Sequence, residues 1–320
     1  SLGKSGRTVV LDLSFAGGVT TNAALDPREA AYYRVIVPSN APAWKVRLSV
    51  TSHGWRVDGA AAALTSLQPG IFDDATDSDI KFWGVSAVKR WQALRGTWNF
   101  YYLGYANRDI QFAQGRGQDE RHTVGVGWRA SHRAVDFNYD LILQQGSFEG
   151  GNVDAWGVSS ETVWRVTTRG WRPRVGLRAN AGSGDRDQRD ESLQSFNPLF
   201  PGASFAGPIG LFGATNMIDV TPFMSVMPSR RLILGVEYPT YWRTSEGDGI
   251  YNTALRLLVP PGAGSGRHVG STVGVLGFWQ VTAHLQLSGA IMRLVPGRFL
   301  DTTFVRGGAG LYSVTAAYRF

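Results

Sequence analysis

The chain has 320 residues with 32 basic and 25 acidic side chains, and its formal net charge is +7. It contains no cysteine, which excludes a disulfide framework and a thiolate metal site. It holds 40 Gly, 11 Trp, 11 Tyr and 16 Phe, yet its mean hydropathy is slightly negative, and no apolar run approaches the ~18 residues of a membrane helix. A chain rich in Gly and aromatic residues but polar on average is typical of a transmembrane β-barrel, in which half of each strand faces lipid.

Segments of alternating apolar and polar residues recur along the whole chain. We place them at about residues 6–15, 43–52, 54–66, 80–91, 96–106, 121–131, 134–147, 154–166, 172–183, 216–227, 230–244, 268–280, 283–295 and 308–320. Val124, Val126 and Trp128, for example, alternate with polar or small residues, which predicts a strand with one apolar face. Each segment is ~10 residues long, which is the length that a tilted strand needs to cross a bilayer.

The connections between these segments alternate in length. Short ones at about 92–95, 131–133, 167–171, 227–230 and 280–282 alternate with long ones at 67–79, 107–120, 148–153, 184–215, 245–267 and 296–307. This alternation is typical of outer-membrane barrels, which have short periplasmic turns and long extracellular loops. The 184–215 connection is long and partly apolar, so we expect it to fold over or into the barrel as a constriction.

The last strand ends the chain on an aromatic residue. Tyr312, Val314, Ala316, Tyr318 and Phe320 share one parity, so the apolar face continues to the C-terminus, as in bacterial outer-membrane barrels. We therefore predict an all-β fold: a transmembrane antiparallel up-and-down β-barrel of about 14 to 18 strands, forming one domain over residues 1–320. The predicted location is the outer membrane of a Gram-negative bacterium, and a soluble sandwich or barrel is the alternative.

Basic residues recur on the polar parity of the strands. A charge on the lipid side at mid-bilayer would cost about 2–4 kcal/mol, so these side chains should point into the lumen. Guanidinium groups bind carboxylates through two parallel hydrogen bonds, and an Arg-lined channel attracts anions. The alternative is pairing with lumenal acids such as Asp136, Asp140 and Glu161, which we expect for about half of them. The candidate pore-lining residues are Lys45, Arg47, Arg56, Arg90, Arg129, Arg165, Arg174, Arg178, Arg231 and Arg243.

Several longer runs of sequence are distinctive. They are FNPLFPGASFAGPIGLFGATNMIDVTPFMSVMPS (Phe196–Ser229), YWRTSEGDGIY (Tyr241–Tyr251), RHVGSTVGVLGFWQVTAHLQLSGAIMRLVPGRFL (Arg267–Leu300), GIFDDATDSD (Gly70–Asp79) and DFNYDLILQQGSF (Asp136–Phe148). Together, these runs resemble the alginate-export family of bacterial outer-membrane porins. The resemblance covers roughly Trp44 to Phe320 and implies a β-barrel channel that passes an acidic exopolysaccharide through an Arg-rich pore. Residues 1–43 do not match, so either the N-terminal strands are incomplete or altered, or this is a smaller relative with fewer strands.

Other kinds of site are less well supported by the sequence. Acidic residues in the loop Gly182–Phe196 and at Asp73, Asp74, Asp77 and Asp79 could bind calcium, but they lack the spacing of a calcium loop, so solvated loops are expected. The five His residues lie near strand ends without a nucleophile motif, so a barrel hydrolase is disfavoured and no enzyme is predicted. The basic residues are spread over the strands, which argues against nucleic-acid binding.

The predicted function is passive export of an acidic, alginate-like polysaccharide by a monomeric barrel that contacts outer-membrane lipid. No cofactor is expected. The energy source would lie elsewhere, because a passive barrel has no nucleotide site and the sequence has no phosphate-binding loop. Periplasmic export proteins are possible partners. An anion-selective porin for the uptake of small acidic nutrients remains the alternative, since both functions require an anion-attracting lumen.

Overall fold

The computed structural model describes residues 8–13, 30–35, 44–66, 75–92, 96–199, 212–303 and 308–319. Side chains are described within 48–62, 79–92, 96–199, 212–303 and 308–319. Most of these residues lie in strands, and the short helix α2 (Arg298–Asp301) follows one of the long strands. No helix in the described ranges is long and apolar enough to cross a membrane.

One 15-stranded sheet contains nearly all of the described strands. Its order is β19-β18-β17-β13-β12-β10-β9-β8-β7-β6-β5-β4-β3, and each of these neighbours pairs antiparallel. The strands of this path are β3 (Trp44–Ser52), β4 (Trp55–Ser66), β5 (Ala75–Trp91), β6 (Gly96–Gln111), β7 (Arg116–His132), β8 (Val135–Phe148), β9 (Gly151–Arg165), β10 (Arg174–Gly182), β12 (Met217–Ser229), β13 (Leu232–Glu237), β17 (His268–Gln280), β18 (Leu285–Pro296) and β19 (Ala309–Tyr318).

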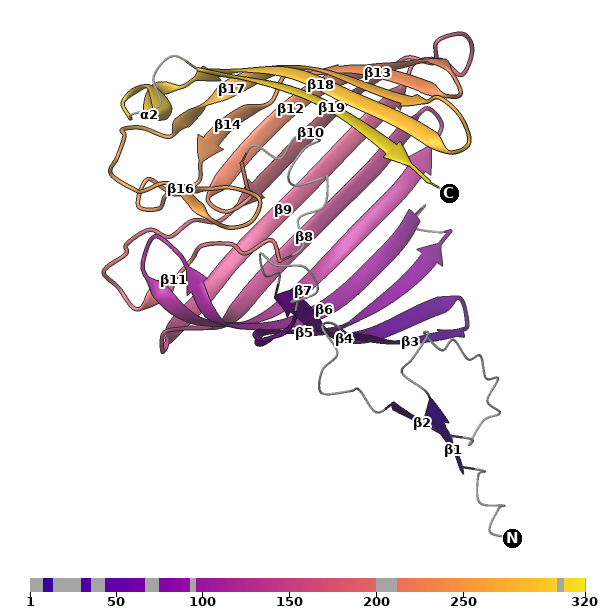
Figure 1. The fold of residues 1–320 in the computed structure, drawn as a ribbon, viewed down its shortest axis with the longest axis vertical. Helices are drawn as coiled ribbons and strands as arrows, with labels where there is room; N and C mark the ends of the chain where they lie inside the picture. The colour runs from indigo at the N-terminus through magenta and orange to yellow at the C-terminus, as the bar shows by residue number, and fades with distance from the viewer. Residues whose placement is uncertain are drawn as a thin grey trace.

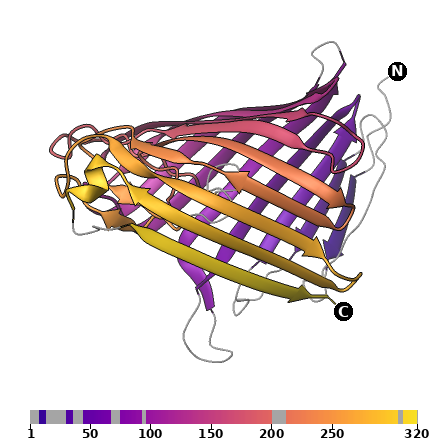
Figure 2. The ribbon, with the colours of Figure 1, turned by 90° about the horizontal axis from the view of Figure 1, so that it is seen from above.

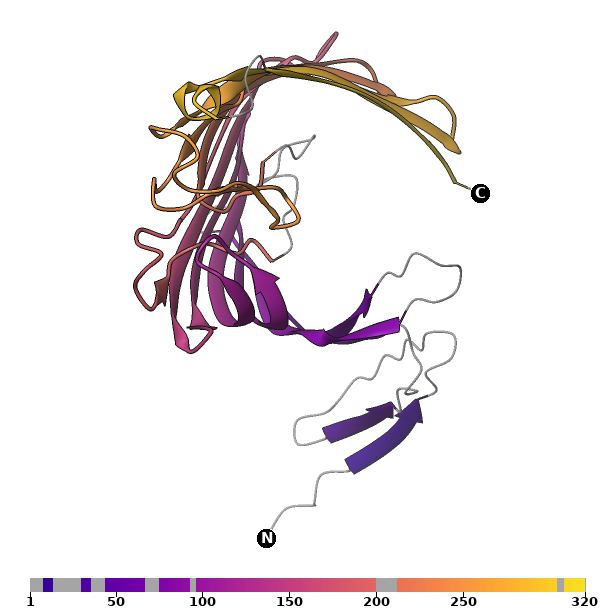
Figure 3. The same cartoon turned by 60° about the vertical axis from the view of Figure 1, so that its left-hand side comes forward.

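The sheet curves into the wall of a β-barrel. Figure 1 and Figure 3 show the strands wrapped around one concave side, with β3 and β19 at the two ends of the wall. Within the described residues these two end strands do not pair with each other. Figure 2 shows the long loops and α2 gathered at one end of the strands, and the C-terminus at the other. The predicted all-β antiparallel barrel fold is confirmed.

Four short strands accompany the long strands of this wall. β14 (Thr240–Arg243) continues the line of β13 and pairs with β12 and β17, and β11 (Ser192–Leu193) adds parallel to β9. β15 (Ile250–Tyr251) and β16 (Leu257–Val259) form a small hairpin of their own. Figure 1 and Figure 3 place the orange loops around β16 on the concave side of the sheet.

Thirteen of the fourteen predicted segments correspond to strands of this sheet, whereas the first does not. Residues 6–15 overlap β1 (Thr8–Leu13), which pairs in parallel with β2 (Ala30–Val35) in a separate two-stranded sheet. The expectation of an antiparallel up-and-down strand was therefore wrong there. Alternation predicts a strand but not its partner, and the connection of residues 14–29 is long enough for a parallel crossover.

One face of the sheet exposes a continuous apolar surface. From β10 to β19 each member of one row pairs with the next: Val175, Met224, Val236, Val275, Ile291 and Tyr312. All of these side chains are exposed, from 43% for Val175 to 78% for Tyr312. An apolar surface that spans this many strands is far larger than a soluble protein leaves in water, and it matches the lipid face of a barrel.

An aromatic band crosses the lipid face near the short turns. Trp55, Trp91 and Phe100 contact one another, and Trp128 stacks on Phe137 with ring centroids 5.7 Å apart. Amphipathic rings at this depth are typical of a membrane interface.

Candidate functional site

The face opposite the apolar rows is polar, and the long loops pack against it. We call this face the inner wall. Most of the predicted basic residues lie on it, but the structure divides them into three groups according to what covers them.

The first group is exposed and lies close to the short turns. Arg90 is the second-last residue of β5, Arg129 lies shortly before the turn at residues 133–134, and Arg174 begins β10. Thr97 pairs with both Arg90 and Arg129, so these two residues lie in one row across β5, β6 and β7. Arg129 Nε donates to Asn138 Oδ1 at 3.0 Å. Arg90 and Arg174 have no hydrogen-bond or ion-pair partner in the described part of the chain.

The second group is paired with acids. Arg56 Nε lies 3.0 Å from Asp58 Oδ2. Arg165 lies 3.4 Å from Asp136 Oδ1 and also donates to the carbonyl oxygen of Arg133 at 2.6 Å. Both pairs are partly exposed, so each adds little to stability.

Arg178, the middle residue of β10, also belongs to this paired group. It lies 3.4 Å from Glu161 and 3.8 Å from Glu237, and its guanidinium group sits 5.4 Å from the centroid of the Phe223 ring. Its side chain is 12% exposed. Two acids and an aromatic face therefore hold Arg178 on the wall, which is the structural pairing that the sequence left open as an alternative.

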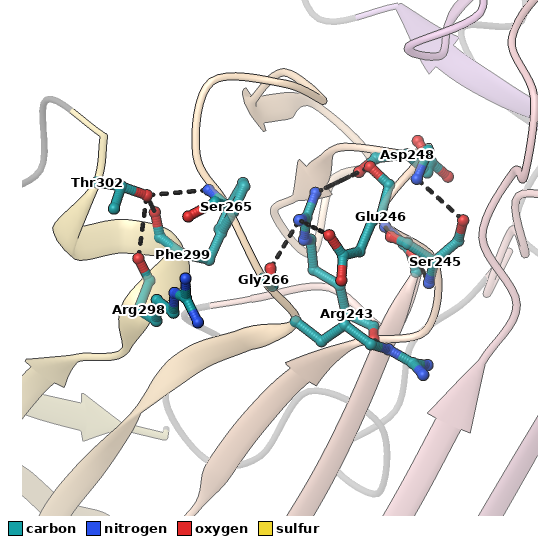
Figure 4. Close-up of polar contacts among 12 residues, drawn as sticks. Arg243, Ser245, Glu246, Asp248, Ser265, Gly266, Arg298, Phe299 and Thr302 are labelled. Carbon is teal, nitrogen blue, oxygen red and sulfur yellow. Dashed lines mark hydrogen bonds and ion pairs between the residues drawn. The ribbon is translucent and has the colours of Figure 1, made fainter.

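The third group contains Arg243, which is buried among the long loops. Its side chain is 1% exposed, and Nη2 donates to the carbonyl oxygen of Gly266 at 2.7 Å. Nη1 donates to the carbonyl oxygens of Glu246 and Asp248, and the group lies 3.8 Å from the centroid of the Phe299 ring in α2 (Figure 4). Arg243 therefore ties three loop segments together and does not present its charge to a solute, because these loops fold over the end of β14.

The remaining predicted residues lie elsewhere. Arg231 is exposed in the turn between β12 and β13, so it is at the rim of the wall. Lys45 and Arg47 lie in β3, where they pair with Ala62 and Ala60, and their side chains are outside the described part of the structure.

A segment of the long 184–215 connection lies on the inner wall. The part that matters is Ser192–Leu199, which we call the inner segment. Phe196 is 1% exposed and packs where Gly157 of β9 has no side chain: a Cβ there would lie 2.5 Å from the Phe196 ring. Leu193 joins Phe112, Phe148 and Tyr251 in a buried apolar cluster.

A cavity of about 400 Å³ lies between the inner segment and the wall of β5–β9. Its lining includes the polar residues Asn99, Arg129, Asn138, Asp140, Ser159 and Asn197 beside apolar ones such as Leu103, Ile142 and Phe196. Arg129 thus faces this cavity, and Asp140, held by the Tyr101 hydroxyl at 2.8 Å, faces the same cavity. The site combines an anion-attracting group with hydrogen-bonding groups on a rigid wall.

Sequence reasoning did not single out the buried polar residues that support this site. Arg121 and Gln144 are 0% and 1% exposed, and both contact the backbone of the inner segment. Arg121 lies in the predicted strand 121–131 on the same parity as Arg129, so that parity was the available signal. Alternation gives the face of a side chain, but it does not tell which loop covers it.

The acidic residues of the predicted loop Gly182–Phe196 also differ in burial. Asp187 is exposed and accepts a hydrogen bond from the backbone of Arg189, whereas Asp185 is fully buried. Burial and the neighbouring Asp248 carboxylate raise the pKa of Asp185 to about 6. Among the described residues, no three acidic, His or Cys side chains converge as a metal site would need. Asp73 and Asp74 lie outside the described residues.

Comparison with known proteins agrees with this geometry. The alginate export family matches residues 43–307. The solved structure of OccK11 (OpdR) from Pseudomonas aeruginosa is 14% identical, with a TM-score of 0.50 over 89% of this chain and 75% of that one.

The NanC porin is 8% identical, with a TM-score of 0.35 over 76% of this chain and 95% of that one. Among curated proteins, none matches this sequence. The family match indicates an outer-membrane channel, and the OccK11 likeness supports the β-barrel fold. The chain belongs to the alginate export family, and it is an outer-membrane channel with a β-barrel fold.

Proposed function

We propose that this channel exports an acidic, alginate-like polysaccharide by passive diffusion along an Arg-bearing inner wall. The observation that carries the proposal is the placement of Arg90, Arg129 and Arg174: all three are exposed on the inner wall and lie close to the short turns. In outer-membrane barrels the short turns are periplasmic, so these charges would stand where an exported polymer enters.

The physical chemistry of these groups suits a polymer in transit. A guanidinium group stays ionised and forms paired hydrogen bonds with a carboxylate, so it can replace a counterion of each uronate unit. Arg90 and Arg174 have no competing acid among the described residues, which leaves their donors available. Exposed ion pairs are worth only about 0–1 kcal/mol, so each contact would form and break readily.

Two acids of the same wall are already paired with an arginine. Glu161 and Glu237 are both engaged by Arg178, so the paired part of the wall has little free negative charge. The unpaired arginines nearer the short turns then set the sign of the local potential. Charged walls of one sign raise the local concentration of the opposite ion.

Uptake of small acidic nutrients is the second candidate, and the inner segment favours it. Ser192–Leu199 covers part of the wall of β7–β9, which narrows the space available to a solute. A narrow lumen suits a small anion, whereas a single extended polysaccharide chain needs a continuous path. The export proposal also includes a monomeric barrel that needs no cofactor and that works with periplasmic export proteins.

Reversal potentials in planar bilayers test the proposal. The purified barrel is placed in a salt gradient, and uronate oligomers of increasing length are then added to the periplasmic side. Anion selectivity with block that strengthens with oligomer length supports polymer export. Anion selectivity with block by monomeric acids alone favours nutrient uptake, and cation selectivity contradicts both functions.

A further inference from the structure

A side-chain amide of the wall binds the backbone of the inner segment. Gln144 Nε2 in β8 donates to the carbonyl oxygen of Asn197 at 2.7 Å, and Gln144 Oε1 accepts from the Asn197 N–H at 2.9 Å. Both backbone groups of one residue are therefore satisfied by one amide, in the way that a neighbouring strand would satisfy them. Gln144 is 1% exposed, so water does not compete for these bonds.

A buried arginine adds a third bond to the same segment. Arg121 Nη1 in β7 donates to the carbonyl oxygen of Ser195 at 2.7 Å and to Gln144 Oε1 at 3.1 Å. Its Nε lies 2.8 Å and 2.9 Å from the two carboxylate oxygens of Asp119, which compensates its charge. Phe112 covers the guanidinium group with its ring centroid at 5.1 Å. Asp119, Gln144 and Phe112 thus fix the orientation of the Arg121 side chain.

The position of the inner segment decides what the wall presents to the lumen. Phe196 and Asn197 line the cavity together with Ser159 of β9, and Ser159 is only 4% exposed while the segment is in place. A segment that moved away would uncover this stretch of wall and would bring its own backbone into the lumen.

We propose that Gln144, aided by Arg121, is a positioning residue that clamps the inner segment to the wall and thereby sets access to the cavity and steady conductance. The clamp is made by backbone contacts, so it depends on the side chains at 121 and 144 and not on the sequence of the segment. Its consequence for transport rests on the proposed channel function, whereas the contact itself does not.

Thiol accessibility tests the clamp directly, because the chain has no natural cysteine. A Ser159→Cys barrel, folded in detergent, is reacted with a charged methanethiosulfonate reagent with and without Gln144→Leu. The Leu side chain keeps the bulk but loses the hydrogen bonds to Asn197, and we expect the modification rate to rise about tenfold, which corresponds to about 1.4 kcal/mol of lost clamping. Gln145→Leu is the matched control, because Gln145 is exposed on the opposite face of the same strand and should leave the rate unchanged.

A conservative variant and single-channel recording complete the test. Gln144→Glu keeps the acceptor for the Asn197 N–H but loses the donor, so its rate should fall between those of the parent and Gln144→Leu; it also carries the test if the Leu variant does not fold. In bilayers, Gln144→Leu should show brief closures that the parent and Gln145→Leu lack.

Equal modification rates in Gln144→Leu and Gln145→Leu, in barrels that show the same heat-dependent gel mobility, would overturn the clamp. A parent barrel without conductance would instead contradict the proposed channel, and the thiol rates would still decide the clamp.

Discussion

Apart from the paired group, the arginines at the two ends of the inner wall differ in burial. Near the long loops, Arg121 and Arg243 are 0% and 1% exposed and donate to loop carbonyl oxygens. Near the short turns, Arg90, Arg129 and Arg174 are exposed. The residue type is the same, and the difference lies in whether a loop covers the side chain. The covered arginines hold the loops in place, and the exposed ones are available to a solute.

Burial also decides how much each arginine contributes to the stability of the barrel. A buried guanidinium group is tolerated only with compensating partners, and removing one member of a buried pair leaves the other charge uncompensated. An exposed arginine has water as an alternative partner, so its removal changes stability little. Substitutions of the buried arginines near the long loops should therefore lower stability. Substitutions of the exposed arginines near the short turns should change ion selectivity instead.

The largest effect is expected for Arg121→Leu. Asp119 is 0% exposed and would lose its partner, so the unfolding free energy should fall by about 3–5 kcal/mol. Arg90→Leu, the exposed counterpart, should change it by less than about 0.5 kcal/mol. Urea titration of the barrel in liposomes, followed by Trp fluorescence, measures both. Equal losses for the two variants would remove the distinction between the two ends.

A smaller effect is expected for Arg243→Lys. Lysine keeps the charge but cannot reach the carbonyl oxygens of Glu246, Asp248 and Gly266 together, so about 1–3 kcal/mol of loop stability should be lost. Limited proteolysis of the 244–266 loops should accelerate in this variant. The same change at exposed Arg174 should leave cleavage as it is in the parent, and faster cleavage there would argue against a purely solute-facing position.

The acidic loop gives a pH dependence that sharpens the same contrast between buried and exposed residues. The pKa of Asp185 lies at about 6, above its ordinary value of 3.8, so between these two values the folded state holds a proton that the unfolded state has lost. The barrel should therefore gain stability as pH falls from neutral through about 6, and this gain is lost again as pH rises.

Urea midpoints at about pH 5 and about pH 7.5 measure this dependence. Asp185→Asn should reduce it, whereas Asp187→Asn, at an exposed position of the same loop, should not. A dependence unchanged in Asp185→Asn would assign the titration to another group, such as Asp248, whose pKa burial also raises.

Much of the fold could be predicted from sequence because a strand in a membrane wall obeys a local rule. Alternation and loop length depend on neighbouring residues only, and they located every strand on the antiparallel path from β3 to β19, though not β11. The parallel pairing of β1 with β2 could not be predicted, since the partner of a strand is a long-range property.

The site was predicted less completely for the same reason. Parity placed Arg90, Arg129 and Arg174 on the inner wall, but it treated Arg243 as equivalent, although loops distant in sequence bury it. Arg121 and Gln144 were missed because their importance depends on the inner segment, which follows Gln144 by about fifty residues and reaches the wall only in the folded chain.

The most direct test of the central claim is the ion selectivity of a barrel in which Arg90, Arg129 and Arg174 are all replaced by Gln. Its matched control replaces the same three residues by Lys, which keeps the charge. Reversal potentials in a salt gradient should show that the Gln barrel loses anion preference while the Lys barrel keeps it, with both folding as the parent does. Unchanged anion preference in the Gln barrel would contradict the account, because the exposed arginines near the short turns would then not set the selectivity of the channel.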